Sequence, residues 1–257
     1  SNKQLFSNSE LKNEYVPVSD EKAEEYLQKF GYILPPQFVD TPNRMAVGFA
    51  IGKDSLKHAV AKFQEYMGLP KTGKLDLPTK KKMAEPRCGV YDIQAISSLR
   101  TTPFKWEKQH LTYSIKNFFP DLPQDDIKSL IKKAFDTWSG VIPLGFEEVR
   151  TQDESADIQI KFASGTHGDP WPFDEEGKVI AHATMPTSGL VHFDNDEKWT
   201  YMGPENAPKD HIDLFTVAIH EIGHTLGLEH SRDKKSIMTP IYKKPVDSNG
   251  NYIAPKL

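Results

Sequence analysis

The stretch HEIGHTLGLEH at residues 220–230 decides the fold, because three of its side chains are spaced to bind one metal ion. His220 and His224 are four residues apart, which places both imidazoles on one face of a helix. Gly227 suits the left-handed conformation that ends a helix, so the chain can turn and bring His230 in as a third ligand. The pattern therefore predicts a helix, a glycine turn and a metal site formed by both.

Three protein ligands leave one coordination position open, an arrangement typical of a catalytic zinc ion and not of a structural one. Glu221 lies about 100° further round the helix than His220, too far aside to be a ligand but placed to touch a water on the ion. An ordinary amphipathic helix with satisfied histidines is the alternative. Five specified positions coincide too rarely by chance to favour it.

The bulk composition is that of a globular protein. The chain has 257 residues, 37% hydrophobic and 26% charged, with a net charge of −4. This length accommodates one large or two ordinary domains. The balance of charge gives no nucleic-acid footprint, and no run approaches the roughly 20 apolar residues of a membrane span. The first residues, SNKQ, lack the apolar core of a signal peptide.

The first half of the sequence is helical in pattern. One helix is expected from Ser19 to Gly31, a second over residues 56–67 and a third over residues 78–84. Residues 31–54 and 89–103 have no clear period and are expected to be a loop and a linker.

The second half mixes strands and helices. Strands are expected at residues 111–115 and 158–162, and helices at residues 127–138 and 212–227. Loops and short strands fill residues 164–199 between them. The order indicates a mixed sheet with a few helices.

Met238 follows His230 by eight residues, and Ser231 stands directly after that histidine. The zinc motif with this methionine resembles the metzincin clan, in which a methionine turn packs beneath the metal site. Ser231 makes the matrix metalloproteinases the most similar family. The resemblance implies an α+β fold: an inhibitory three-helix propeptide over residues 1–100, then a catalytic domain over residues 101–257. That domain would have a twisted, mixed five-stranded sheet and an active-site helix.

Cys88 is the single cysteine, so the chain has no internal disulfide. A lone thiol is an inert buried residue, a nucleophile or a metal ligand. The sequence PRCGV at residues 86–90 resembles the cysteine switch of matrix metalloproteinase propeptides. The resemblance implies that Cys88 fills the open zinc position in a latent zymogen, with a sulfur–zinc distance of about 2.3 Å. It also implies a bracing salt bridge between Arg87 and Asp92, although Tyr91 replaces the usual proline.

Two further ion sites are implied by the same resemblance. A structural zinc site would have four protein ligands and no open position: His167, Asp169, His182 and His192. A calcium site would use three acidic residues: Asp174, Asp194 and Glu197. Two zinc ions and at least one calcium ion are therefore expected. The short loop at residues 187–191 argues against a second calcium site, although Asp157 remains available for a reduced site.

The resemblance also implies how an extended peptide would bind. The strand at residues 179–184, which includes Ala183, would pair with the substrate. Thr216, Pro240 and Tyr242 would shape the pocket beyond the scissile bond. The implied protein is a secreted, extracellular, monomeric hydrolase that degrades matrix proteins such as collagen. Its expected partners are protein substrates, protein inhibitors and activating proteases, with no nucleic acid and no membrane span.

Two expectations concern the ends and the processing of the chain. Only 19 residues follow Met238, so the final helix of relatives and their hemopexin domain are not expected here, whether by truncation or by nature. Activation is expected by a first cut within residues 31–54 and a final cut near residues 97–100. The alternative function is a non-enzymatic one, either a peptidoglycan-binding module or a catalytically dead protease scaffold.

Overall fold

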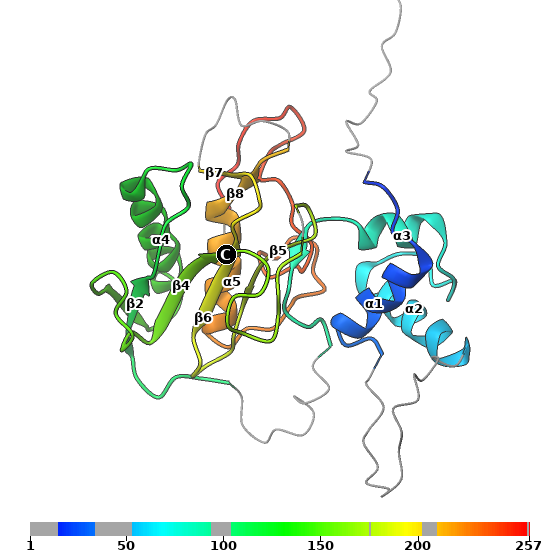
Figure 1. The fold of residues 1–257 in the computed structure, drawn as a ribbon, viewed down its shortest axis with the longest axis horizontal. Helices are drawn as coiled ribbons and strands as arrows, with labels where there is room; N and C mark the ends of the chain where they lie inside the picture. Colours follow the sequence, from blue (N-terminus) through cyan, green and yellow to red (C-terminus); the bar gives the residue numbers. More distant parts are fainter. Residues whose placement is uncertain (1–14, 34–52, 94–103, 175, 202–209, 256) are drawn as a thin grey trace, which may run out of the picture.

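A computed structural model describes residues 15–33, 53–93, 104–174, 176–201, 210–255 and 257. Figure 1 shows two parts, a bundle of three helices and a larger part built on a sheet. The predicted domain boundary at residue 100, the predicted final cut and most of the loop predicted for the first cut lie outside the described residues. Within the described ranges, no helix is long and apolar enough to cross a membrane.

The N-terminal bundle contains the three predicted helices: α1 (Asp20–Lys29), α2 (Lys53–Met67) and α3 (Leu77–Met83). Ser19 caps α1 by accepting a hydrogen bond from the Lys22 N–H at 3.2 Å, and Asp76 caps α3 through the Thr79 N–H at 3.1 Å. The apolar stripes of the helices form one core, which includes Leu27, Phe30, Val60, Phe63 and Met83.

The main sheet has six strands in the order β1-β5-β6-β4-β2-β3. Five strands belong to the larger part: β2 (His110–Ile115), β3 (Gly145–Glu148), β4 (Ile158–Ala163), β5 (Val179–Ala183) and β6 (Leu190–Asp194). The pairs are parallel except β5 with β6. The expected five-stranded mixed sheet is therefore present.

The sixth strand, β1 (Arg87–Cys88), comes from the segment around the single cysteine and pairs in parallel with β5. The sequence analysis did not predict it as a strand. Two short strands, β7 (Trp199–Thr200) and β8 (Ile212–Asp213), form a separate pair, which moves the start of the following helix two residues beyond its predicted position.

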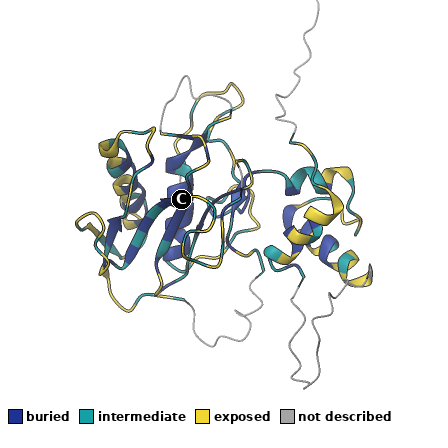
Figure 2. Cartoon of the chain, viewed as in Figure 1, coloured by how far each residue is buried: buried dark blue, intermediate teal, exposed yellow. Residues whose placement is uncertain are grey.

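Two helices complete the larger part, α4 (Gln124–Ser139) and α5 (Leu214–Thr225). The predicted stripe of α4 is buried, and its Trp138 indole donates a hydrogen bond to the Ile219 carbonyl of α5 at 2.9 Å. Figure 2 shows that burial concentrates in the sheet and α5, while α4 and the N-terminal helices expose their outer faces. Helix α5 is thus fixed on the sheet and positions the residues of the HEIGHTLGLEH stretch.

Candidate metal centres

Helix α5 and the turn after it deliver three histidines to one place. Asp213 caps the helix by accepting a hydrogen bond from the Thr216 N–H at 2.7 Å. The helix ends at Thr225, and Gly227 has a φ of 99°, the left-handed conformation predicted for it. An added Cβ at this glycine would collide with the Phe104 carbonyl, so a side chain is excluded there. The turn leads directly to His230.

Each of the three histidines uses its Nδ1 atom in a hydrogen bond to an oxygen. His220 Nδ1 lies 2.7 Å from the Ile237 carbonyl, and His224 Nδ1 lies 2.7 Å from the Leu228 carbonyl. His230 Nδ1 lies 2.9 Å from the Asp92 carboxylate. Because these oxygens only accept, Nδ1 carries the hydrogen and Nε2 keeps a lone pair. The Nε2 atoms of His220 and His224 are 3.1 Å apart, and that of His230 is buried without a partner.

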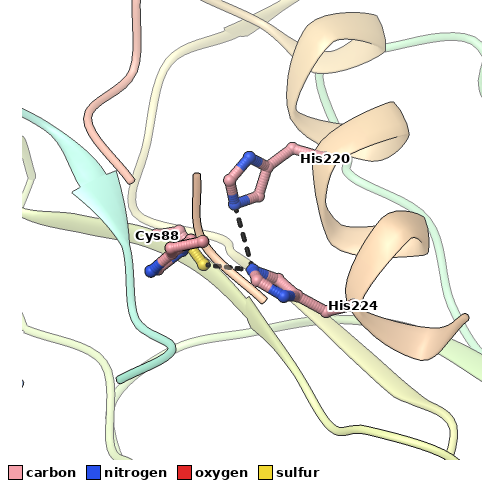
Figure 3. A group of neighbouring side chains, drawn as sticks. Cys88, His220 and His224 are labelled. Carbon is pink, nitrogen blue, oxygen red and sulfur yellow. Dashed lines mark hydrogen bonds between the residues drawn. The ribbon is translucent and has the colours of Figure 1, made fainter. Parts of the chain in front are cut away.

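The Cys88 sulfur completes this group. It lies 3.5 Å from His224 Nε2, and the four ligand atoms all lie within 4.8 Å of one another. Figure 3 shows the Cys88 sulfur pointing toward the His224 ring. Ligands of a tetrahedral zinc ion are separated by roughly 3.3–3.6 Å, from Zn–N and Zn–S bonds of about 2.0–2.3 Å. The distances and the donor set of three neutral nitrogens and one sulfur therefore fit zinc.

Burial shifts every titratable group of this centre toward its neutral form. It lowers the pKa of His220 to about 3 and that of His224 well below its usual value. It raises the pKa of the Cys88 thiol, and the nearby Glu221 charge raises it further. Burial raises the pKa of Glu221 to about 8, and neither of its carboxylate oxygens has a partner. The neutral imidazoles point their Nε2 lone pairs at one place, beside the Glu221 carboxyl group. A cation bound there would supply the partner that these lone pairs lack.

The segment that carries Cys88 is held on both sides. Strand β1 pairs with β5 on one side, and on the other Arg87 forms an antiparallel bridge with Ile241. The Cys88 N–H donates to the Pro240 carbonyl at 2.9 Å, and the Tyr242 N–H donates to the Pro86 carbonyl at 2.9 Å. Residues 86–88 therefore fill the space between the β5 edge and the chain at residues 240–242.

Arg87 is buried and forms the ion pair with Asp92 that the resemblance implied, with Nη2 2.6 Å from Oδ1. Its guanidinium group lies over the Phe30 ring, 3.4 Å from the ring centroid, and its Nη1 also contacts the Tyr26 hydroxyl. Burial alone would raise the pKa of Asp92, but Arg87 and His230 more than offset it and hold that pKa below its usual value. Contacts of Arg87 with Tyr26 and Phe30 of the N-terminal bundle thus hold the segment in place.

A second group gathers the four side chains predicted for a structural zinc ion. The ring nitrogens of His182 and His192 each lie 2.8 Å from Asp169 Oδ2, and His167 Nε2 lies 3.1 Å from it. Burial by itself raises the pKa of Asp169, but hydrogen bonds, first from His182, lower it to about 2. Burial lowers the pKa of His182 to about 4, so its ring is neutral at pH 7 and available to a metal. Among the residues that the structure describes, this group and the Cys88 group are the two compact metal-ligand sets.

The three acids predicted for calcium are not among these compact sets, but the charge of Asp174 acts on both Asp194 and Glu197. Burial raises the pKa of Asp194 to about 7 and that of Glu197 to about 7. Backbone hydrogen bonds lower both pKa values in part, and the charges of nearby acids raise them. Asp194 Oδ2 is buried without a partner. Asp174 accepts a hydrogen bond from the Val179 N–H at 3.1 Å. Asp157 accepts hydrogen bonds from the Thr112 N–H and Lys108.

A pocket of about 400 Å³ opens beside His220 and Glu221. Three residues predicted for the substrate pocket line it: Thr216, Pro240 and Tyr242. The Tyr242 hydroxyl accepts a hydrogen bond from the Asp213 N–H at 2.9 Å, which ties the wall to the start of α5. Val246, Ile253 and Pro255 add a C-terminal wall that the sequence analysis did not predict. Ala183 lies at the end of β5, outside this lining.

Met238 lies beneath the histidine helix. An added Cβ at Gly223 would lie 2.5 Å from the Met238 sulfur and 2.9 Å from Trp138 Cζ2. Gly223 stands between His220 and His224, so a close fit to both side chains supports the ligand helix. The motif leaves position 223 unspecified, so no role for Gly223 was predicted from the sequence.

We expect Gly223→Ala to destabilise the protein by about 1–3 kcal/mol, the usual cost of adding a methyl group to a filled core. Gly140→Ala is the matched control, because an added Cβ there meets only carbonyl oxygens of its own helix at 3.4 Å and 3.6 Å. The control should change stability by less than about 1 kcal/mol. The midpoint of urea unfolding measures both, and equal midpoints would contradict the tight packing.

A metal-ligand helix with HExxH, a glycine turn to a third histidine and a methionine beneath them define a class, the zinc metallopeptidases with an extended histidine motif. The profile of the matrixin family matches residues 105–253, and that of a putative peptidoglycan-binding domain matches residues 21–83. The chain belongs to the matrixin family, whose members are zinc-dependent metalloendopeptidases.

Two relatives illustrate the extent of the similarity. Matrix metalloproteinase-C of Caenorhabditis elegans is 50% identical over 256 residues, covering 98% of this chain and 43% of that protein. Matrix metalloproteinase-16 of Homo sapiens is 44% identical over 236 residues, covering 86% of this chain and 37% of that protein. The chain thus spans less than half the length of these curated relatives.

Proposed function

We propose that the chain is a latent zinc endopeptidase in which Cys88 blocks the catalytic centre. The observation that carries the proposal is the convergence of the Cys88 sulfur with His220, His224 and His230 within the spacing of one tetrahedral ion. His220, His224 and His230 would hold the catalytic zinc, and His167, Asp169, His182 and His192 would hold a structural zinc. Zinc supplies Lewis-acid polarisation of a carbonyl group and acidifies a water molecule.

Glu221 would act as the general base and then as the general acid. Its buried carboxyl group has no partner, so it is available to take a proton from water and later give it to the leaving amine. The raised pKa of Glu221, about 8 when the site is metal-free, eases the acid step; the charge of a zinc ion would favour the ionised base.

The substrate would be an extended protein segment. With residues 86–88 removed, the edge of β5 through Ala183 is available for strand pairing, and the chain at residues 240–242 faces it. A side chain of the substrate would enter the pocket lined by Thr216, Pro240 and Tyr242. We further propose that the protein acts outside the cell on matrix proteins, with protein inhibitors and activating proteases as partners, as its family similarity suggests.

Hydrolysis of a quenched peptide tests this function. The full chain should be inactive, should become active after limited proteolysis removes Cys88, and should lose activity with a zinc chelator. Peptidoglycan binding by residues 21–83 is the alternative that the second profile match raises. It would be favoured if the cleaved protein stayed inactive with zinc bound while the full chain sedimented with peptidoglycan.

A calcium ion held by Asp174, Asp194 and Glu197 is part of the proposal. Two buried acids with a pKa of about 7 and an unpartnered oxygen on Asp194 fit an oxygen-binding cation. Without the ion, the folded protein holds these protons more tightly than the unfolded chain. The two protonated acids then contribute to the free energy of unfolding near pH 4, and this contribution is lost as the pH rises toward 7.

We therefore expect calcium to raise the melting temperature strongly at pH 8 and little at pH 5. At pH 8 the melting temperature with calcium should exceed that without calcium by at least about 2–4 °C, which corresponds to about 1 kcal/mol in the free energy of unfolding for a chain of this size. Dialysis into calcium-free buffer that contains zinc should remove the effect. Asp194→Asn should abolish the calcium effect, and Asp196→Asn, which changes an exposed neighbour, should retain it. An equal calcium effect at both pH values would count against this site.

A further inference from the structure

The three histidines of the Cys88 centre differ in what holds their outer nitrogen. His220 and His224 donate from Nδ1 to carbonyl oxygens of the same part of the chain, Ile237 and Leu228. His230 donates from Nδ1 to a carboxylate, that of Asp92. Asp92 lies four residues beyond Cys88, on the segment that blocks the centre. One of the three ligands is thus oriented by a residue outside the larger part of the protein.

Asp92 is held firmly enough to orient a ligand. Its Oδ1 atom accepts from His230 and from Arg87 Nη2 at 2.6 Å, and its Oδ2 atom accepts from Arg87 Nη1 at 3.0 Å and from the Tyr32 hydroxyl at 2.7 Å. The side chains of Asp92 and His230 are both 0% exposed. A fully buried carboxylate with four hydrogen bonds has no freedom to turn away from the imidazole.

We propose that Asp92 is a positioning residue for His230, so that the inhibitory segment acts on the metal centre at two points. Cys88 reaches the centre directly, and Asp92 reaches it through His230. This inference rests on the proposed zinc site. Its consequence is that the centre binds zinc more tightly in the latent chain than the Cys88 contact alone explains. Removal of residues 86–92 leaves His230 without its carboxylate.

The physical reason is the charge of the acceptor. A hydrogen bond from a ring N–H to a carboxylate is stronger than one to a carbonyl, and it increases the electron density at the other ring nitrogen. It also fixes the tautomer and the orientation of the ring. Loss of such an outer partner typically lowers metal affinity about 10–100-fold. The carbonyl partners of His220 and His224 give the same tautomer without the charge.

The test measures zinc affinity by chelator competition in the full chain, with Glu221→Ala present in every variant to prevent self-cleavage. Asp92→Asn should weaken zinc binding at the Cys88 centre about 10–100-fold. Tyr32→Phe is the matched control, because it removes a hydrogen bond to the same carboxylate and leaves the His230 contact. The control should change the affinity less than about threefold. The second centre, with His167 and His182, is an internal reference whose affinity should stay constant.

Cobalt substitution reports whether the inhibitory segment stays in place. A thiolate–cobalt charge-transfer band shows that Cys88 is bound. Weaker metal binding in Asp92→Asn with the band retained supports the inference, whereas unchanged affinity with the band retained overturns it. Absence of the band in the chain that carries only Glu221→Ala would overturn the proposed binding of Cys88 to the metal, and with it the two-point action of the segment.

If Asp92→Asn releases the inhibitory segment, the cobalt band is lost and the affinity of this variant no longer reports on Asp92 alone. The role of Asp92 is then tested by NMR in the chain that keeps Asp92. In the latent zinc protein, the His230 Nδ1 proton should resonate clearly downfield of those of His220 and His224, as expected for a carboxylate acceptor. Three equal chemical shifts would contradict the role of Asp92.

Discussion

Replacement of Glu221 by alanine should leave zinc bound and lower peptide hydrolysis by the activated enzyme by at least about 10²–10⁴-fold, the usual contribution of general acid–base catalysis. Glu221 is fully buried beside the histidines, and the Cys88 thiol, which activation removes, is the side chain that acts on its carboxyl group in the latent chain. The ligands His220, His224 and His230 are unchanged in this variant, which separates loss of chemistry from loss of metal.

The assay compares kcat for a quenched peptide with the zinc content of the same sample. Glu229→Ala is the matched control, because this exposed carboxylate lies in the same motif and outside the centre. The control should keep its activity within about twofold, as surface substitutions rarely disturb a site. Activity of Glu221→Ala within a few-fold of the unchanged enzyme would remove Glu221 from the mechanism.

Replacement of Cys88 by serine should make the full chain active without proteolysis. A neutral hydroxyl group is a far weaker zinc ligand than a thiolate, whereas the two side chains have nearly the same size. We expect basal hydrolysis to rise at least about tenfold, which corresponds to about 1.4 kcal/mol of lost inhibition. Self-cleavage should follow and should be visible by mass spectrometry.

Tyr91→Ser provides the control, since Tyr91 is an exposed residue of the same segment. It should stay as inactive as the unchanged chain. In the double variant Cys88→Ser with Glu221→Ala, self-cleavage should disappear, because the same centre performs it. A Cys88→Ser chain that is as inactive as the unchanged protein would show that the sulfur does not impose latency.

Features with a fixed spacing were predictable from the sequence. The histidine motif specifies a helix and a turn, and the structure gives α5 and a left-handed Gly227. The apolar stripes of α1 and α4 specify their buried faces, because apolar residues recur with a period of 3.6 along both helices. The resemblance to the cysteine switch implied that Arg87 and Asp92 are partners, and they form a buried ion pair.

Features that depend on distant contacts were not predictable. Strand β1 has two residues and exists only because β5 offers a free edge, so no alternation marks it. Strand β3 reads Gly-Phe-Glu-Glu, which has no regular alternation either. The contact between Asp92 and His230 joins residues 138 positions apart, and no local pattern encodes it. The contacts of Asp157 with Lys108 and the Thr112 N–H were not predicted either, because these residues lie 49 and 45 positions away.

The most direct measurement of the central claim is zinc X-ray absorption on the full chain before and after proteolytic activation. In the latent chain we expect one zinc–sulfur contact at about 2.3 Å, at the catalytic zinc and not at the structural zinc. This contact should be lost as peptidase activity appears. A latent chain with zinc bound but no zinc–sulfur contact, or full activity with the contact retained, would contradict the central claim.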